Sequence, residues 1–156
     1  MTGFMRLSLA LALCLALGAG QALAIGGGSS SAKKDNPDYA QAVKRVEAGD
    51  YAGAIPLLQK SIAADPTNAD AHNYLGFSHR KLGNVEMALT YYGKALELNP
   101  KHRGANEYLG ELYLDLGQLD KAKERLAVLD KACFFGCDEY RELKAKIKAY
   151  QAKASS

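Results

Sequence analysis

The sequence predicts an all-α protein, in which three helix–turn–helix repeats form a solenoid and a further C-terminal helix caps it. Three observations predict this class. Ala, Leu and Lys are prominent and β-branched residues are sparse, which favours helix over strand. Glycines, alanines and prolines recur every 34 residues through most of the chain, and a last segment has apolar residues at helical spacing. The length of 156 residues suits one compact domain.

The first 24 residues are predicted to be a secretory signal peptide. Residues 1–6 form a short basic region, and residues 7–17 form an unbroken apolar core. Small residues precede a cleavage site between Ala24 and Ile25. We therefore expect a periplasmic or secreted protein that meets the membrane only transiently, through its signal peptide.

Two other interpretations fit the residues of this segment less well. A retained membrane anchor needs about 20 continuous apolar residues, and the apolar core has eleven. A lipoprotein signal would acylate Cys14, but Leu13 stands where a small residue is expected. The pattern favours a cleaved signal peptide over both.

The charge of the mature chain argues against a nucleic-acid partner. Removal of the signal peptide takes away Arg6 and leaves 19 basic and 17 acidic side chains. Nucleic-acid binding normally requires a strong basic excess on one face. Residues 25–34, which read IGGGSSSAKK, are predicted to be a flexible leader because they offer little apolar surface to bury.

The 34-residue period is carried by several residue types at once. It is seen in the glycines Gly49, Gly83 and Gly117, the alanines Ala54, Ala88 and Ala122, the prolines Pro66 and Pro100, and the pairs Leu75-Gly76 and Leu109-Gly110. Small residues allow two helices to approach closely, and Gly or Pro supplies the turns between them. This agreement across three copies indicates a helical repeat.

A repeat of this length, with Leu-Gly early, Ala in the middle, an aromatic residue four positions later and Pro near the end, resembles the tetratricopeptide repeat (TPR) family. The resemblance divides the chain into units 35–68, 69–102 and 103–136. The middle unit carries the motif at His72, Leu75, Gly76, His79, Ala88, Tyr92, Ala95 and Pro100. The outer units keep fewer motif positions, as terminal repeats commonly do.

Each unit is predicted to contain two helices. The expected ranges are 37–48, 53–64, 69–82, 86–98, 103–116 and 120–132. Pro56 lies early in the second of these helices and lacks an N–H, so we expect that helix to start late or to be distorted.

Residues 137–152 are predicted to form the capping helix, and residues 153–156 a disordered tail. Tyr140, Leu143, Ile147 and Tyr150 are spaced by three, four and three, which places them on one helical face. Asp138 can cap the start of this helix. Such a helix would shield the end of the repeat array from water.

Cys133 and Cys137 flank the junction between the last repeat and the capping helix. In an oxidising compartment, the pair suggests a disulfide that would stabilise the cap by about 2 kcal/mol. A thiol–disulfide switch and a reduced buried pair are the alternatives, although the usual redox spacing is absent. Phe134 and Phe135 are expected to anchor the cap in the core.

No catalytic, metal or cofactor site is predicted. His72 and His79 are seven residues apart on one helix, about 10.5 Å along its axis, and both occupy positions that pack between helices. His102 is expected in a loop. The sequence contains no metalloprotease, phosphate-loop or nucleophile-elbow motif. We therefore expect a non-enzymatic protein without a small-molecule substrate.

The resemblance implies that a partner binds in a groove lined by the first helix of each unit. The residues implied to face it are Tyr39, Val43, Asn73, Phe77, Arg80, Glu107 and Glu111. Such a set suits a peptide segment of another envelope protein. The family's carboxylate-binding subtype uses a specific set of Lys, Asn and Arg groups in this groove. Tyr39 and Val43 occupy the corresponding positions of the first repeat here, so binding of a chain-end carboxylate is not predicted.

The leading functional hypothesis is a protein-interaction scaffold or adaptor of the cell envelope. A redox module acting through Cys133 and Cys137 is the alternative. Weak self-association through Tyr39, Val43 and Val46, at the start of the array, is a third possibility.

Overall fold

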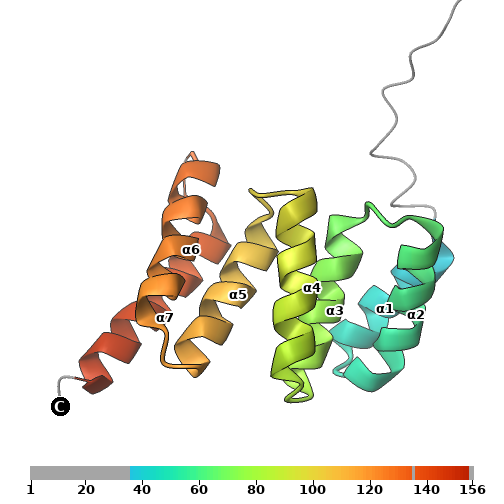
Figure 1. Ribbon diagram of the computed structural model, residues 1–156, viewed down its shortest axis with the longest axis horizontal. Coiled ribbons are helices and arrows are strands. Elements are labelled where there is room, and N and C mark those ends of the chain that lie inside the picture. Colours follow the sequence, from blue (N-terminus) through green and yellow to red (C-terminus); the bar gives the residue numbers. More distant parts are fainter. Residues whose placement is uncertain (1–35, 135, 155–156) are drawn as a thin grey trace, which may run out of the picture.

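A computed structural model describes residues 36–134 and 136–154, which fold into helices without any strand (Figure 1). The predicted signal peptide and leader lie outside the described residues. The helices are α1 (Pro37–Glu47), α2 (Tyr51–Ala64), α3 (Ala69–Lys81), α4 (Val85–Leu98), α5 (Arg103–Asp115), α6 (Leu119–Ala132) and α7 (Asp138–Ala154). The predicted all-α class is confirmed.

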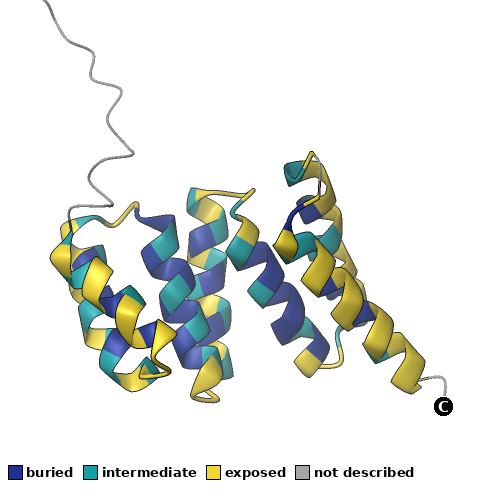
Figure 2. Ribbon diagram, turned by 180° about the vertical axis from the view of Figure 1, so that it is seen from behind, coloured by how far each residue is buried: buried dark blue, intermediate teal, exposed yellow. Residues whose placement is uncertain are grey.

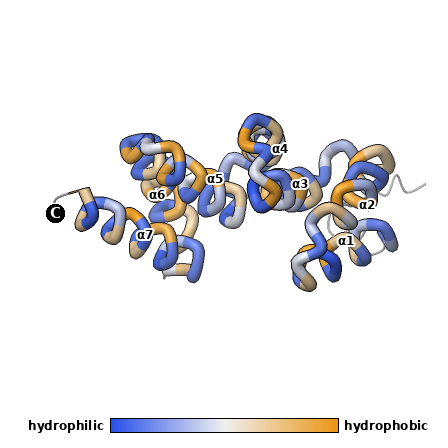
Figure 3. Tube along the Cα trace, turned by 90° about the horizontal axis from the view of Figure 1, so that it is seen from below, coloured by the Kyte–Doolittle hydropathy of each residue, from blue (hydrophilic) through white to orange (hydrophobic). Residues whose placement is uncertain are grey.

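The helices stack as antiparallel pairs in two layers. In the view of Figure 3, α2, α4 and α6 lie on one side of the array, and α1 and α7 lie on the other. Helix α3 packs on α1 and α2, α5 packs on α3 and α4, and α7 packs on α5 and α6. Helix α7 therefore takes the place of the first helix of a fourth unit.

The turn within each unit depends on a glycine with positive φ. Gly49, Gly83 and Gly117 have φ of 78°, 80° and 73°, a conformation that other residues rarely adopt. In the first turn, the Asp50 N–H donates back to the Arg45 carbonyl at 2.8 Å, and the other two turns repeat this bond. The first helix of each unit, which is α1, α3 or α5, therefore ends one residue earlier than predicted.

Helix α2 corrects the expectation about Pro56. The helix begins at Tyr51, two residues earlier than predicted, and continues through Pro56 to Ala64. The Asp50 side chain caps it by accepting from the Gly53 N–H at 2.9 Å. This cap fixes the first turn before the proline is reached.

The core is a row of side chains between the two layers (Figure 2). Its largest member, Tyr92, is fully buried and lies against Gly76 of α3. A Cβ at residue 76 would lie 2.6 Å from the Tyr92 ring, so glycine at this position allows α3 and α4 to pack closely. The glycine of the Leu75-Gly76 pair is therefore required because a larger residue would clash with the tyrosine of the next helix.

Helix α7 covers the C-terminal end of the array. Leu143 and Ile147 are buried, and Leu143 packs against Gly110 of α5. Asp138 is the first helical residue, so the capping position is one residue earlier, at Cys137, whose carbonyl accepts from Arg141 N–H. The helix extends to Ala154, two residues into the predicted tail.

The junction before α7 corrects the expectation that Phe134 anchors the cap. The Phe134 side chain is 92% exposed. Phe135 lies outside the described residues. Apolar contact between the cap and the array comes from α7 itself, because Tyr140, Leu143 and Ile147 supply it.

Candidate functional site

Three adjoining hollows form a groove along α1, α3, α5 and α7. The first hollow, of about 460 Å³, is lined by Tyr39, Asp70, Asn73, Tyr74, Asn99, Lys101, His102, Arg103, Gly104, Tyr108 and Glu139. The second, of about 610 Å³, is lined by Phe77, Arg80, Lys81, Glu107, Tyr108, Glu111, Asp115, Glu142 and Lys146. The third, of about 320 Å³, is lined by Arg80, Glu111, Leu114, Asp115, Lys146, Ala149, Tyr150 and Lys153. Shared lining residues make the hollows continuous.

Aromatic rings line the groove where the first two hollows meet. Phe77 of α3 packs on Tyr108 of α5 with ring centroids 4.8 Å apart. Phe77 also meets Tyr51 of α2, with ring centroids 5.8 Å apart, and its side chain is half-buried. Tyr39 and Tyr74 form an edge-to-face pair at 6.1 Å. Burial raises the pKa of Tyr108 to about 12 and keeps its hydroxyl protonated.

Arg80 is held by acidic side chains of the neighbouring unit. Its guanidinium donates to Glu111 at 2.6 Å and to Asp115 at 2.6 and 3.1 Å. Arg80 is one of the residues predicted to face a partner in the groove. Its charge is instead neutralised within the array, because α3 and α5 pack side by side and face their polar residues toward each other.

Three carboxyl groups converge where α5 meets α7. Oxygens of Glu107, Glu111 and Glu142 lie within 4.8 Å of one another. Glu111 also pairs with Lys146 of α7. Burial, with the charges of Glu111 and Glu142 adding to it, raises the pKa of Glu107 to about 8. A Glu107 carboxyl that keeps its proton near neutral pH reduces repulsion in this cluster.

The remaining predicted groove residues are distributed unevenly. Tyr39 lines the first hollow, and Val43 is half-buried on α1 without lining any of the three hollows. Asn73, Glu107 and Glu111 are buried, with 5%, 4% and 7% exposure, although they line the hollows. The structure therefore brings together six of the seven predicted residues. Val46, proposed for self-association with Tyr39 and Val43, is buried in the core.

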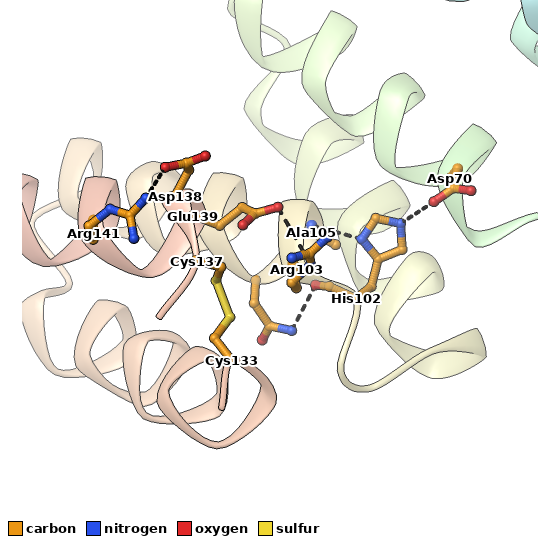
Figure 4. A network of polar contacts seen from close by, with 10 residues as sticks. Asp70, His102, Arg103, Ala105, Cys133, Cys137, Asp138, Glu139 and Arg141 are labelled. Carbon is orange, nitrogen blue, oxygen red and sulfur yellow. Dashed lines mark hydrogen bonds and ion pairs between the residues drawn. A yellow bond between two sulfur atoms is a disulfide. The ribbon is translucent and has the colours of Figure 1, made fainter. Parts of the chain in front are cut away.

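His102, which was expected in a loop, caps a helix and joins two units. It occupies the capping position of α5, where its Nδ1 accepts from the Ala105 N–H at 3.1 Å (Figure 4). Its Nε2 faces Asp70 of α3 at 2.8 Å, so the ring joins two units. Asn68, which is 34 residues earlier, caps α3 in the same way. The repeat period could have identified this cap.

The two other histidines are structural, as predicted. His79 stacks on Tyr91 with ring centroids 5.5 Å apart, and burial lowers the pKa of His79. His72 also meets Tyr91, and its Nε2 lies 3.1 Å from the Pro66 carbonyl oxygen. Both rings pack between α3 and α4.

Cys133 and Cys137 are joined by a disulfide with a Cα–Cα distance of 5.6 Å. The bridge ties the end of α6 to the start of α7, and Cys137 is buried. It lies at the end of the array near Glu139, which contacts Arg103 of α5 at 3.6 Å (Figure 4). Helix α7, and with it one wall of the groove, is therefore held at its first turn.

Comparisons with known proteins identify the class. A family model described as tetratricopeptide repeat matches residues 69–102, and a TPR repeat model matches residues 44–83. The matches support the tetratricopeptide repeats that the sequence predicted, over residues 44–102. None of the curated proteins compared with the chain matched it.

Solved structures share this fold at low sequence identity. The type III secretion translocator chaperone SycD of Yersinia enterocolitica is 18% identical, with a TM-score of 0.68 over 83% of this chain and 90% of that chain. PcrH, solved with the chaperone binding region of PopD, is 21% identical, with a TM-score of 0.67 over 83% and 98%. The second TPR domain of human RPAP3, solved with an HSP70 peptide, is 23% identical, with a TM-score of 0.63 over 71% and 92%.

None of the helices in the described part of the chain has the length and hydropathy needed to cross a bilayer.

Proposed function

We propose that this protein is a non-enzymatic scaffold or adaptor that binds a segment of another cell-envelope protein in its groove. The observation that carries the proposal is the continuity of the three hollows along α1, α3, α5 and α7. A continuous groove suits an extended or helical segment better than a small molecule, which normally occupies a more enclosed and apolar cavity.

The solved structures of similar fold support a peptide ligand. PcrH was solved with a region of PopD, SycD with a peptide of YopD, and RPAP3 domains with HSP70 and HSP90 peptides. The location in the envelope is part of the proposal and rests on the signal peptide predicted from residues 1–24.

The groove offers both rings and charges to such a segment. Lys81 is exposed, and its ammonium lies 5.9 Å from the ring of Tyr51 and 5.8 Å from that of Phe77. Lys101 is exposed at the rim of the first hollow. A partner could pack apolar side chains on the rings while its polar groups meet these cations.

Site-specific photocrosslinking tests this assignment. A crosslinking residue is placed at Lys81 or Lys101 in the groove, or at exposed Lys60 of α2 as the matched control. We expect the two groove positions to capture the same partner segment from the native envelope, and Lys60 to capture a different set or none. The same products from all three positions would reject the groove as the binding site.

The crosslinked segment then allows a direct measurement. A synthetic peptide with its sequence should bind the purified protein, and Lys81→Glu should weaken that binding by roughly threefold to tenfold. Lys60→Glu should leave the affinity unchanged. Equal affinities for the two variants would contradict the proposal.

A further inference from the structure

Glu107 of α5 is a buried carboxyl group without a cationic partner. It is 4% exposed, and no described lysine, arginine or histidine lies within ion-pair distance of it. Its hydrogen-bonding neighbour is another carboxyl group, that of Glu142 on α7. Glu111 completes the cluster, in which oxygens of the three residues lie within 4.8 Å of one another. The sequence predicted no metal site here, because α5 and α7 meet only in the fold.

The Tyr92 hydroxyl is a second, independent observation at the same place. Tyr92 of α4 is fully buried, and its hydroxyl oxygen has no hydrogen-bond partner among the described residues. Its ring lies beside Tyr108 of α5, with ring centroids 6.5 Å apart. Burial raises the pKa of Tyr92, and the charges of Glu111 and Glu107 raise it further, so the hydroxyl lies near the carboxyl cluster. A water molecule carried by a bound ion can donate to this oxygen.

The donor atoms and their spacing suit calcium. Ca²⁺ binds carboxylate and other oxygen ligands at about 2.3–2.6 Å, so two ligands of one ion can lie up to about 5 Å apart. The three carboxyl oxygens fall within that span. Mg²⁺ requires shorter distances of about 2.0–2.1 Å in a regular octahedron, and Zn²⁺ is bound mostly by histidine and cysteine. The cluster lines the open second hollow, where water can supply the remaining ligands.

Two cations already contact Glu111, and only one of them has to leave. Arg80 donates to one Glu111 oxygen at 2.6 Å, and the Arg80 side chain is 16% exposed. Lys146 pairs with the other oxygen, but its side chain is 50% exposed, so its ammonium can move out into the solvent. The immediate surroundings of the ion then hold three carboxylates and one guanidinium, whose charges a single divalent ion balances. The proton that Glu107 keeps in the ion-free protein leaves as the ion enters.

We propose that Glu107, Glu111 and Glu142 bind a calcium ion, and that the Tyr92 hydroxyl accepts a hydrogen bond from a water molecule on that ion. Such an ion joins α5 to the capping helix α7, which pack against each other. The disulfide holds only the first turn of α7, so the ion provides a second attachment further along this helix. The site does not rest on the proposed function, because it needs no partner segment.

Calcium chloride alone is the probe for this site. The full-length mature protein, freed of metal with EDTA, is titrated by calorimetry, and its ¹⁵N-labelled form by NMR. We expect saturable binding of a single ion with a Kd of roughly 10⁻⁴–10⁻³ M, and magnesium should bind at least about tenfold more weakly. The amide signals that shift should centre on Glu107, Glu111 and Glu142. No binding up to about 10 mM calcium, or shifts confined to other, exposed acidic residues, would overturn the site.

Variants of exposed residues test the ligands without disturbing the core. Glu142→Gln removes an exposed ligand and should weaken calcium binding roughly tenfold or more. Lys146→Met removes the competing ammonium and should strengthen calcium binding about threefold. Glu124→Gln, which changes an exposed carboxylate of α6, is the matched control and should leave the affinity unchanged. Wild-type affinity in Glu142→Gln, or weaker binding in Lys146→Met, would overturn the proposal.

Two further measurements test the hydroxyl and the link between the helices. Tyr92→Phe keeps the ring and should weaken calcium binding about threefold. It should leave the melting temperature of the ion-free protein unchanged or higher, because the hydroxyl has no partner to lose. Saturating calcium should slow hydrogen exchange in α7 and leave α1 unchanged. Wild-type affinity in Tyr92→Phe would contradict the place given to the hydroxyl, and equal exchange of α7 with and without calcium would overturn the link between α5 and α7.

Discussion

At the scale of single residues, two buried glutamates one helical turn apart differ in how their charge is balanced. Glu111 accepts from Arg80 and pairs with Lys146, so its charge is compensated on both sides. Glu107 faces two other carboxyl groups, those of Glu111 and Glu142. Burial and these neighbours raise the pKa of Glu107 to about 8, so its neutral form is the one that fits the folded protein.

This difference predicts how stability depends on pH. Between its ordinary pKa of 4.5 and about 8, Glu107 keeps a proton in the folded protein that the unfolded chain releases. The free energy of unfolding contributed by this group therefore falls as the pH rises through that window. Glu107→Gln should remove the fall and make the variant at least about 1 kcal/mol more stable than wild type at pH 9. Urea unfolding at pH 5, 7 and 9 measures this.

The control for this prediction is Glu124→Gln, which removes an exposed carboxylate of α6. It should leave the slope of stability with pH unchanged. If Glu107→Gln also left the slope unchanged, the carboxyl would be ionised in the folded protein throughout, contrary to its buried position.

At two glycines within helices, substitution by alanine should change the stability of the protein in opposite directions. A Cβ at Gly76 would lie 2.6 Å from the fully buried Tyr92 ring, whereas a Cβ at Gly93 would meet nothing within 4 Å. Gly76→Ala should therefore destabilise by about 1–3 kcal/mol. Gly93→Ala should stabilise by roughly 0.5–1 kcal/mol, because alanine favours helix. Thermal unfolding of both variants measures the two changes in stability. Equal changes would contradict this explanation of the glycine in the Leu-Gly motif.

At the scale of elements, α7 both covers the end of the array and forms part of the groove. Its buried face carries Leu143 and Ile147, while Glu142 and Lys146 line the second hollow. The disulfide between Cys133 and Cys137 holds its first turn against the end of α6. Loss of this constraint should therefore disturb the groove as well as the cap.

We expect the double substitution Cys133→Ser and Cys137→Ser to weaken the docking of α7 by about 2 kcal/mol. Hydrogen exchange should become faster in residues 138–154 and stay unchanged in α1 and α2. A redox titration tests the alternative of thiol exchange: a structural bridge should have a potential below about −300 mV, whereas a value near −200 mV would support a redox function.

The elements could be predicted from the sequence far better than the contacts within the groove. Helices recur with the 34-residue period because glycine turns and small packing positions are local requirements, so their ends fell within two residues of prediction. The pairing of Arg80 with Glu111 depends on which faces of α3 and α5 are turned toward each other. A single sequence does not reveal how each helix is rotated about its own axis. The junction at Phe134 breaks the period, and there the prediction was wrong.

At the scale of the whole molecule, ion pairs link the second unit, the third unit and the capping helix across the groove. Arg80 of α3 binds Glu111 and Asp115 of α5, and Lys146 of α7 also binds Glu111. Arg80 and Glu111 have side chains that are 16% and 9% exposed, whereas the Asp115 side chain is 59% exposed. Water therefore screens the Arg80–Asp115 pair much more than the Arg80–Glu111 pair.

A double-mutant cycle should reveal this difference. Arg80→Met alone should destabilise the array by about 2–4 kcal/mol, because it removes a partner of a buried carboxylate. The coupling energy of Arg80 with Glu111, measured with Glu111→Gln, should exceed that with Asp115, measured with Asp115→Asn, by at least about 1 kcal/mol. Urea unfolding of the single and double variants gives both values. Equal coupling energies would contradict this prediction, because they would mean that solvent screens both pairs alike.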